Sequence, residues 1–102
     1  MYEIRLEPTF QADYRRTMRR YPHLRSDFEH VVRELANHGT VPESYHPHVL
    51  SNPGGNYNAH WDFHLSDGLV DVVVLYVPHK TNPIIRLVRM GSHEELFQGP
   101  LL

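Results

Sequence analysis

The chain has 102 residues, of which 40% are apolar, and its formal net charge is −2 with histidine neutral. This length favours one domain over residues 1–102, and no run of eighteen apolar residues offers a membrane span. Cysteine is absent, which excludes disulfides and thiolate chemistry. The first residues show no apolar signal core, so we expect a cytoplasmic protein.

Residues 2–7 alternate apolar and charged side chains, with Tyr2, Ile4 and Leu6 on one face, and predict a half-buried strand. A helix is expected from Pro8 or Thr9 to the Tyr21–Pro22 stop. A second helix is expected from about Leu24 to Asn37, ended by His38–Gly39. Together they predict an αα-hairpin.

Residues 40–56 predict a loop, because proline and glycine interrupt any regular element. Residues 56–66 alternate strictly and predict a strand with an apolar core face and a second, polar face. The polar face carries Asn58, His60, Asp62, His64 and Ser66.

Residues 69–77 are apolar on both faces apart from Asp71 and predict a central strand covered on both sides. A further strand is expected over 84–90, before Gly91. Ser92 and Glu95 have the spacing of a capping box on a last helical turn. The order β-α-α-β-β-β predicts an α+β fold, with two N-terminal helices packed on a mostly antiparallel four-stranded sheet.

Two features of the composition bear on chemistry. Arginines gather in the first helix and just beyond it, at Arg15, Arg16, Arg19, Arg20 and Arg25, where they form either a phosphate-binding face or a solvated helix surface. Nine histidines are many for this length. Histidine transfers protons near neutral pH and also binds metals, so both functions stay open.

Two segments resemble the YafQ branch of the RelE toxin superfamily. The first is His48-Val49-Leu50, followed after Gly55 by Tyr57, then by His64 and Asp67, and by an apolar strand that closes on Tyr76. The second and more specific segment runs from Arg89 to Phe97 and is similar to the pattern R-x-G-T/S-H-x-x-L-F. The predicted order of elements also agrees, so the likeness covers nearly the whole chain.

The resemblance implies a RelE-like toxin that cleaves mRNA within the ribosome, where it would also contact rRNA. It further implies a cognate antitoxin, usually a small dimeric DNA-binding protein whose flexible tail wraps the toxin. It implies neither a metal nor another cofactor.

Carried over by position, the resemblance makes His48, His64, Asp67 and His93 the catalytic residues. It makes Arg89 and Phe97 substrate-binding residues, to which the helical arginine face adds Arg15 and Arg19.

Metal-free RNA cleavage needs a base for the 2′-hydroxyl, an acid for the leaving 5′-oxygen and donors for the phosphorane. We assign His48 as base and His93 as acid, with His64 and Arg89 on the phosphate. Asp67 would orient a histidine, and Phe97 would stack on a nucleobase. The spacing from His64 to Asp67 is one residue shorter than the family's usual one, so Asp62 could take this role instead.

Two alternatives remain at this stage. The first is a zinc site, because His46-x-His48 and His60-x-Asp62-x-His64 could supply three or four ligands. The second is a non-catalytic module in which the toxin fold only binds antitoxin or RNA. The resemblance gives no role to the surface histidines His23, His30, His38 and His79.

Overall fold

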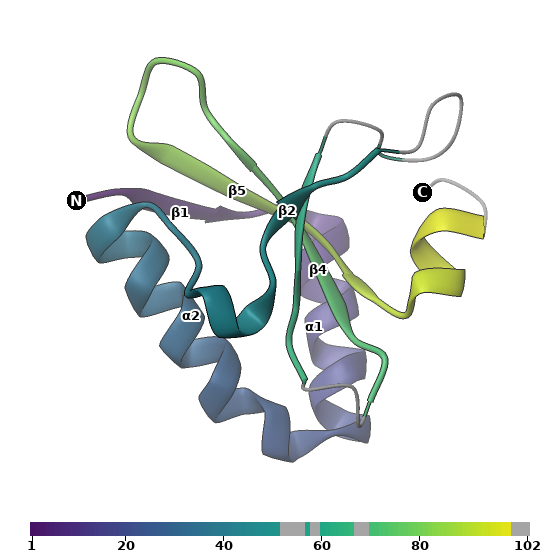
Figure 1. Ribbon diagram of the computed structural model, residues 1–102. Coiled ribbons are helices and arrows are strands. Elements are labelled where there is room, and N and C mark those ends of the chain that lie inside the picture. Colours follow the sequence, from purple (N-terminus) through teal and green to yellow (C-terminus); the bar gives the residue numbers. More distant parts are fainter. Residues whose placement is uncertain (52–56, 58–59, 67–69, 99–102) are drawn as a thin grey trace.

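The computed structural model describes residues 1–51, 57, 60–66 and 70–98 (Figure 1). The elements are β1 (Glu3–Leu6), α1 (Pro8–Arg20), α2 (Arg25–His38), β2 (His48–Val49), β3 (Trp61–His64), β4 (Val73–Pro78) and β5 (Ile84–Gly91). Short 3₁₀ turns occupy Pro22–Leu24 and Glu43–Tyr45, and a single π-helical turn occupies Glu94–Gln98.

The two helices agree with the predicted spans, because local signals set their ends. Pro8 lies in the first turn of α1, where a missing backbone N–H costs nothing. Gly39 closes α2 in the left-handed conformation, with φ 74°, and its N–H donates to the Leu35 carbonyl. A side chain at Gly39 would also collide with the Tyr2 ring. The helices meet at Pro22–Leu24 and diverge as a V (Figure 1).

The sheet has five strands in the order β1-β5-β4-β3-β2, one more than the sequence predicts. The additional strand is β2, two residues of the expected loop that pair antiparallel with β3. β1 pairs parallel with β5, and the other pairs are antiparallel. Among the described residues, β3 is shorter than the predicted 56–66 strand.

The central strand β4 is covered on both faces, as predicted. Val74 and Tyr76 belong to the main core, which α1 and α2 supply with residues such as Phe10 and Leu35. The alternate residues Val73 and Leu75 face the other way and pack against Leu96 of the C-terminal turn. Each face of β4 therefore has its own cluster.

The strand register decides which face carries the histidines. Asp62 pairs with Leu75, and His64 pairs with Val73, so both share the face of the smaller cluster. His48 pairs with Asp62 from β2 and lies on the same face. The sheet thus presents His48, Asp62 and His64 beside the C-terminal turn, opposite the helices.

Candidate active site: a row of histidines on the helix-free face

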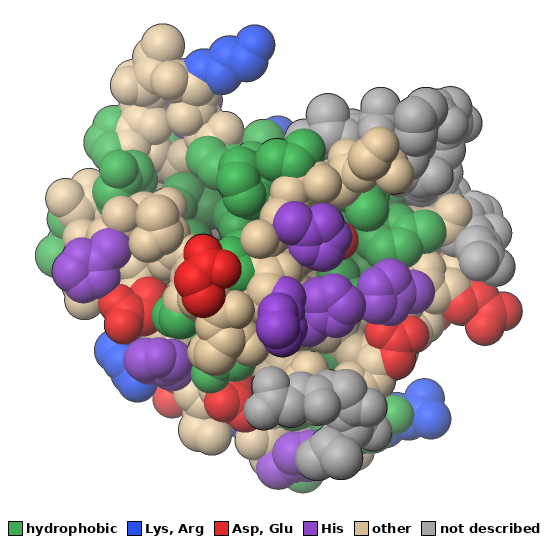
Figure 2. Space-filling view, in the orientation of Figure 1, with side chains coloured by type: hydrophobic (Ala, Val, Ile, Leu, Met, Phe, Trp, Pro, Cys, Tyr) green, Lys and Arg blue, Asp and Glu red, His purple; other side chains and the backbone are tan. Residues whose placement is uncertain are grey.

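Three histidines from distant parts of the chain form a row. The His48 and His64 rings are stacked with centroids 6.1 Å apart, and the His64 and His93 centroids are 5.2 Å apart. Figure 2 shows several histidine side chains gathered side by side on this surface. β2, the end of β3 and the C-terminal turn each contribute one member, so folding brings together three of the four residues predicted as catalytic.

His48 stands at one end of the row, above a buried carboxylate. Its Nδ1 lies 3.1 Å from the His46 carbonyl oxygen and 3.1 Å from Asp62 Oδ1. Both neighbours are acceptors, so Nδ1 carries the proton and Nε2 keeps its lone pair. The side chain is half exposed. Nε2 of His48 is therefore the nitrogen left to take a proton or bind an ion.

Asp62 is 1% exposed, although the sequence placed it on an open polar face. Its Oδ1 accepts no hydrogen bond from the described residues, although His48 Nδ1 lies 3.1 Å away, because the hydrogen bond of Nδ1–H goes to the His46 carbonyl. Burial raises the pKa of Asp62, and the nearby His48, His64 and His93 oppose that rise. Asp62 thus supplies a desolvated acceptor beneath the row.

His93 stands at the other end and is held by Asp71. Its Nδ1 lies 2.7 Å from Asp71 Oδ1, and its backbone N–H donates to Asp71 Oδ2 at 3.1 Å. The predicted capping box is confirmed: Ser92 N–H donates to Glu95 Oε1, and Glu95 N–H donates to Ser92 Oγ, both at 3.1 Å. The turn and the carboxylate together orient the imidazole.

Asp71 was not among the predicted site residues. It precedes β4 and meets His93 only through the fold, 22 residues along the chain. One signal was available, because Asp71 is the single charged residue in the apolar stretch 69–77. Asp67, the predicted acid, lies outside the described residues.

His64 lies between the other two histidines and is partly buried. Burial lowers its pKa, Asp62 acts against this effect, and the neighbouring histidines His93, His48 and His46 lower it further. A neutral His64 is the consequence near neutral pH. In this form it offers one donor and one acceptor to a ligand.

Phe97 and His46 complete the surroundings of the row. The Phe97 ring centroid lies 5.6 Å from that of His93, and Phe97 packs against Val73 and Leu75. His46 has a left-handed backbone, with φ 53°, and its ring lies 6.3 Å from His64. Phe97 is therefore placed where a stacked base would also meet His93. His60 contacts Tyr57 and is not part of the row.

The structure revises our expectation for Arg89. Its side chain is buried, and its Nε donates to Asp13 Oδ2 at 2.6 Å. Its Nη1 donates to the Tyr57 hydroxyl at 3.2 Å. Asp13 also accepts from the Met90 N–H and from Arg16. This network joins α1 to β5 and holds the Arg89 guanidinium inside the protein rather than on the exposed surface.

The helical arginines divide between two surfaces. Arg16 and Arg20 line a hollow of about 290 Å³ that also includes Asp71 and Ser92, next to His93. Arg15 borders a different groove, with Leu6 and Tyr14. Arg15 and Arg19 are exposed, but no described contact links them to the histidines, and their role in RNA binding stays a prediction.

Solved structures similar to this chain define its class. A metal-bound toxin from Helicobacter pylori is 28% identical with a TM-score of 0.76, and the match covers 95% of this chain and 100% of that one. A copper-bound mutant toxin from the same organism is 22% identical over the same shares, with a TM-score of 0.72. The Escherichia coli DinJ–YafQ toxin–antitoxin complex matches at 19% identity and a TM-score of 0.72, over 93% of this chain and 96% of that one. The class is that of bacterial toxins with a RelE-like α+β fold.

The family follows from the sequence. A profile described as the bacterial toxin of the type II toxin–antitoxin system, YafQ, matches residues 2–98. The chain belongs to this YafQ family, as the motifs around His48 and His93 indicated. A search of curated proteins finds no match. Within the described ranges, no helix combines the length and apolar character needed to cross a membrane.

Proposed function

We propose that this toxin is a ribosome-dependent endoribonuclease that cuts mRNA with its histidine row. One observation carries the proposal: the outer histidines each engage an acceptor through Nδ1, and neither Nε2 has a hydrogen-bond partner among the described residues. Two such imidazoles can serve as base and acid, because histidine is the side chain that gives or takes a proton near neutral pH.

In the proposed reaction, His48 removes the proton from the 2′-hydroxyl of RNA. The 2′-oxygen attacks the adjacent phosphorus, and the bond to the 5′-oxygen of the next nucleotide breaks. Protonated His93 gives its proton to that leaving oxygen, and a 2′,3′-cyclic phosphate remains. Asp71 holds Nδ1 of His93, which leaves Nε2 as the nitrogen that would give its proton to the leaving oxygen.

The other residues would position the substrate. His64, in the middle of the row, would donate a hydrogen bond to a phosphate oxygen in its neutral form. Phe97 would stack on a base and hold the strand splayed for in-line attack. With Arg89 buried, the positive charge at the phosphate would come from protonated His93 instead.

The proposed partners are a cognate antitoxin, the ribosome with its rRNA, and the bound mRNA, all in the cytoplasm. Membership of a type II toxin–antitoxin family supports the antitoxin. The E. coli relative has been solved as a toxin–antitoxin complex. We expect the antitoxin to be a dimeric DNA-binding protein.

The experiment compares wild type, His93→Gln and His38→Gln in a ribosome-dependent cleavage assay. His38 is an exposed histidine of α2, which covers the opposite face of the sheet from the row, so its variant controls for the substitution itself. We expect His93→Gln to cut about 10²-fold to 10⁴-fold more slowly, and His38→Gln to match wild type. Cleavage by His93→Gln at the wild-type rate would remove His93 as the acid. Absence of cleavage by wild type would favour a non-catalytic binding module.

A second candidate function is metal binding at the same place. His48, Asp62 and His64 each offer one ligand atom, and these atoms all lie within 4.8 Å of one another. The buried Asp62 Oδ1, which accepts no hydrogen bond from the described residues, fits this set, since two imidazoles and a carboxylate suit zinc or copper. The two H. pylori relatives are described as metal-bound and copper-bound.

RNA cleavage and metal binding both use His48, so the response of cleavage to a chelator distinguishes whether the metal inhibits or supports the reaction. A metal held by His48, Asp62 and His64 would take the lone pair that the proposed base needs. If the ion is an inhibitor, cleavage survives a strong chelator and falls when Zn²⁺ or Cu²⁺ is added. If the ion is essential, chelation abolishes cleavage and the metal-free reaction is refuted.

A further inference from the structure

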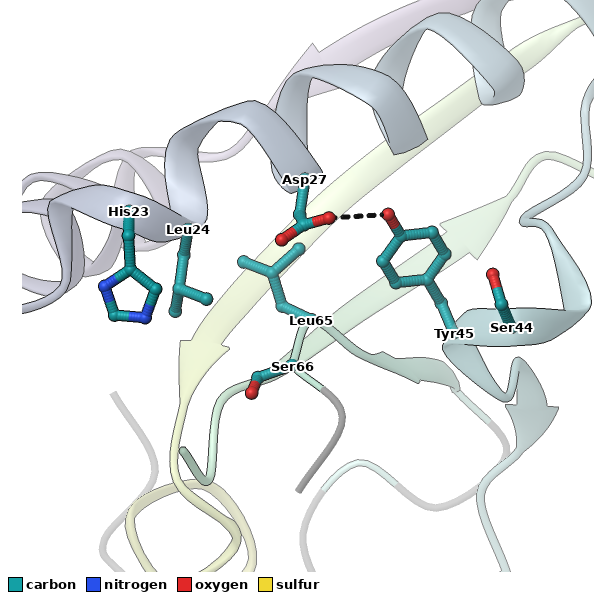
Figure 3. A pocket seen from close by; sticks show the side chains of 7 residues that line it. All are labelled: His23, Leu24, Asp27, Ser44, Tyr45, Leu65 and Ser66. Atoms are coloured by element: carbon teal, nitrogen blue, oxygen red, sulfur yellow. Dashed lines mark hydrogen bonds between the residues drawn. The ribbon is translucent and has the colours of Figure 1, made fainter. Parts of the chain in front are cut away.

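A polar pocket lies apart from the histidine row, and Figure 3 shows the residues that line it. It has a volume of about 240 Å³ between the start of α2, the 3₁₀ turn Glu43–Tyr45 and the end of β3. Leu24 and Leu65, both almost fully buried, form its apolar wall. None of the residues assigned to the cleavage reaction lines it.

Chain connectivity ties this pocket to the row. Tyr45 directly precedes His46, and Leu65 directly follows His64. The rings of His46 and His64 are themselves 6.3 Å apart. The pocket and the row therefore share the end of β3 and the segment before β2, although Leu65 and His64 face opposite sides of the sheet. An RNA strand that occupies both would pass around this edge of the sheet.

The pocket offers acceptors that are fixed in advance. The Tyr45 hydroxyl donates to Asp27 Oδ1 at 2.9 Å, and the other carboxylate oxygen points into the pocket (Figure 3). No hydrogen bond or ion pair to that second oxygen is found among the described residues. Tyr45 is held by ring contacts to Phe63 and His30. The carboxylate is thus oriented before any ligand arrives.

This chemistry selects the class of ligand. A carboxylate repels phosphate and accepts hydrogen bonds only, so the ligand must present donors. The apolar wall of Leu24 and Leu65 suits a flat ring. Guanine presents two adjacent donors, N1–H and the N2 amino group, on its Watson–Crick edge, and RNA-binding proteins commonly read this edge of unpaired bases.

We infer that this pocket binds a guanine base of the mRNA next to the cleavage site, read by Asp27. The inference rests on the proposed function and adds a determinant of substrate choice. Asp27 accepts from N1–H and N2–H, and Tyr45 holds the carboxylate in place. The base lies against Leu24 and Leu65.

The test is a nuclear magnetic resonance titration of the full chain with guanosine 5′-monophosphate and with inosine 5′-monophosphate. The two nucleotides differ only in the N2 amino group. We expect both to shift the signals of the pocket residues, with inosine 5′-monophosphate binding about tenfold to a hundredfold more weakly, the value of one hydrogen bond to a charged acceptor. Equal affinities, or shifts confined to other residues, would overturn the inference.

A matched pair of variants tests the residue. Asp27→Asn keeps the shape but replaces an acceptor by a donor, so it should erase the difference between the two nucleotides. Glu29→Gln, an exposed change of the same charge on α2 outside the pocket, should preserve it. If an arginine-containing peptide shifts the pocket signals and the nucleotides do not, the pocket belongs to a protein partner and the inference fails.

The titration measures binding without cleavage, so the pocket assignment and the proposed nuclease activity can fail independently. A chain that distinguishes the nucleotides but never cuts message refutes the proposed nuclease and keeps the pocket assignment. A chain that cuts message but binds both nucleotides equally refutes the pocket alone.

Discussion

The helix-covered face of the sheet holds fifteen of the buried apolar residues that the structure describes, whereas the opposite face holds three. The first face joins β1, β3, β4 and β5 to both helices. The second carries His48, His64 and His93 over a cluster formed by Val73, Leu75 and Leu96. Apolar burial is the main stabilising term in folding, so one face supports the fold and the other is free to hold polar chemistry.

Truncating one leucine in each cluster gives the largest contrast. Leu35→Ala in the main core should lower the free energy of unfolding by about 2 to 5 kcal/mol, measured by urea denaturation. Leu96→Ala should lower it by at most about 2 kcal/mol, because the C-terminal turn can open by itself. Its effect should appear as faster hydrogen exchange at His93 and slower RNA cleavage. A global loss for Leu96→Ala as large as that for Leu35→Ala would remove the distinction between the faces.

The Arg89 network is a buried polar connection between α1 and β5. Arg89→Met should cost about 3 kcal/mol of unfolding free energy, because it strips Asp13 of its buried partner. Arg86→Met, which removes an exposed pair with Glu7, should cost under about 1 kcal/mol. The double variant Asp13→Asn/Arg89→Met should recover part of the loss. If Arg89→Met folds normally yet fails to cut RNA, Arg89 acts on the substrate after all.

Features set by local sequence signals were predicted better than features set by contacts between distant residues. The helices agree with the predicted spans within a residue or two, because apolar spacing and Gly39 are local signals. The strand β2 was missed, since two residues pair only because β3 lies beside them. The main core was recognisable for the same reason as the helices, because the spacing of apolar residues can be read directly from the sequence.

The site was predicted less completely, because its contacts are long-range. His48, His64 and His93 were found through motifs, and Asp62 was named as an alternative acid, but Asp71, the carboxylate partner of His93, was missed. Asp71 and His93 are 22 residues apart, and Asp13 and Arg89 are 76 apart. No local pattern marks Asp13 as an acid buried at 1% exposure. Asp62 and Arg89 are buried because other elements pack over them, and the spacing of residues in one sequence does not reveal that packing.

A substitution at Asp62 should affect the rate of RNA cleavage without lowering the free energy of unfolding. Because burial raises the pKa of Asp62 in the folded chain, the ionised carboxylate lowers the free energy of unfolding. The contribution that protonated Asp62 makes to this free energy is fully present below pH 3.8 and is lost as pH rises through the folded pKa. Asp62→Asn should therefore leave the free energy of unfolding at pH 7 unchanged or increased. It should slow cleavage about tenfold by removing the charge beside His48. A variant that is both destabilised and fully active would contradict this assignment.

The smallest expected effect is the change in thermal stability that His64 causes as the pH falls. Because burial lowers the folded pKa of His64 below its usual 6.5, the unfolded chain takes up the proton first as pH falls. Its stabilising contribution is therefore present above pH 6.5 and is lost as pH falls through the folded pKa. Between pH 7 and pH 5.5 the wild-type Tm should fall about 2 to 4 °C more than that of His64→Gln, measured by calorimetry. His38→Gln, a change at an exposed histidine, should follow wild type. Parallel curves for wild type and His64→Gln would show that the middle of the row titrates like a surface histidine, and the face opposite the helices would then be more open to water than its packing indicates.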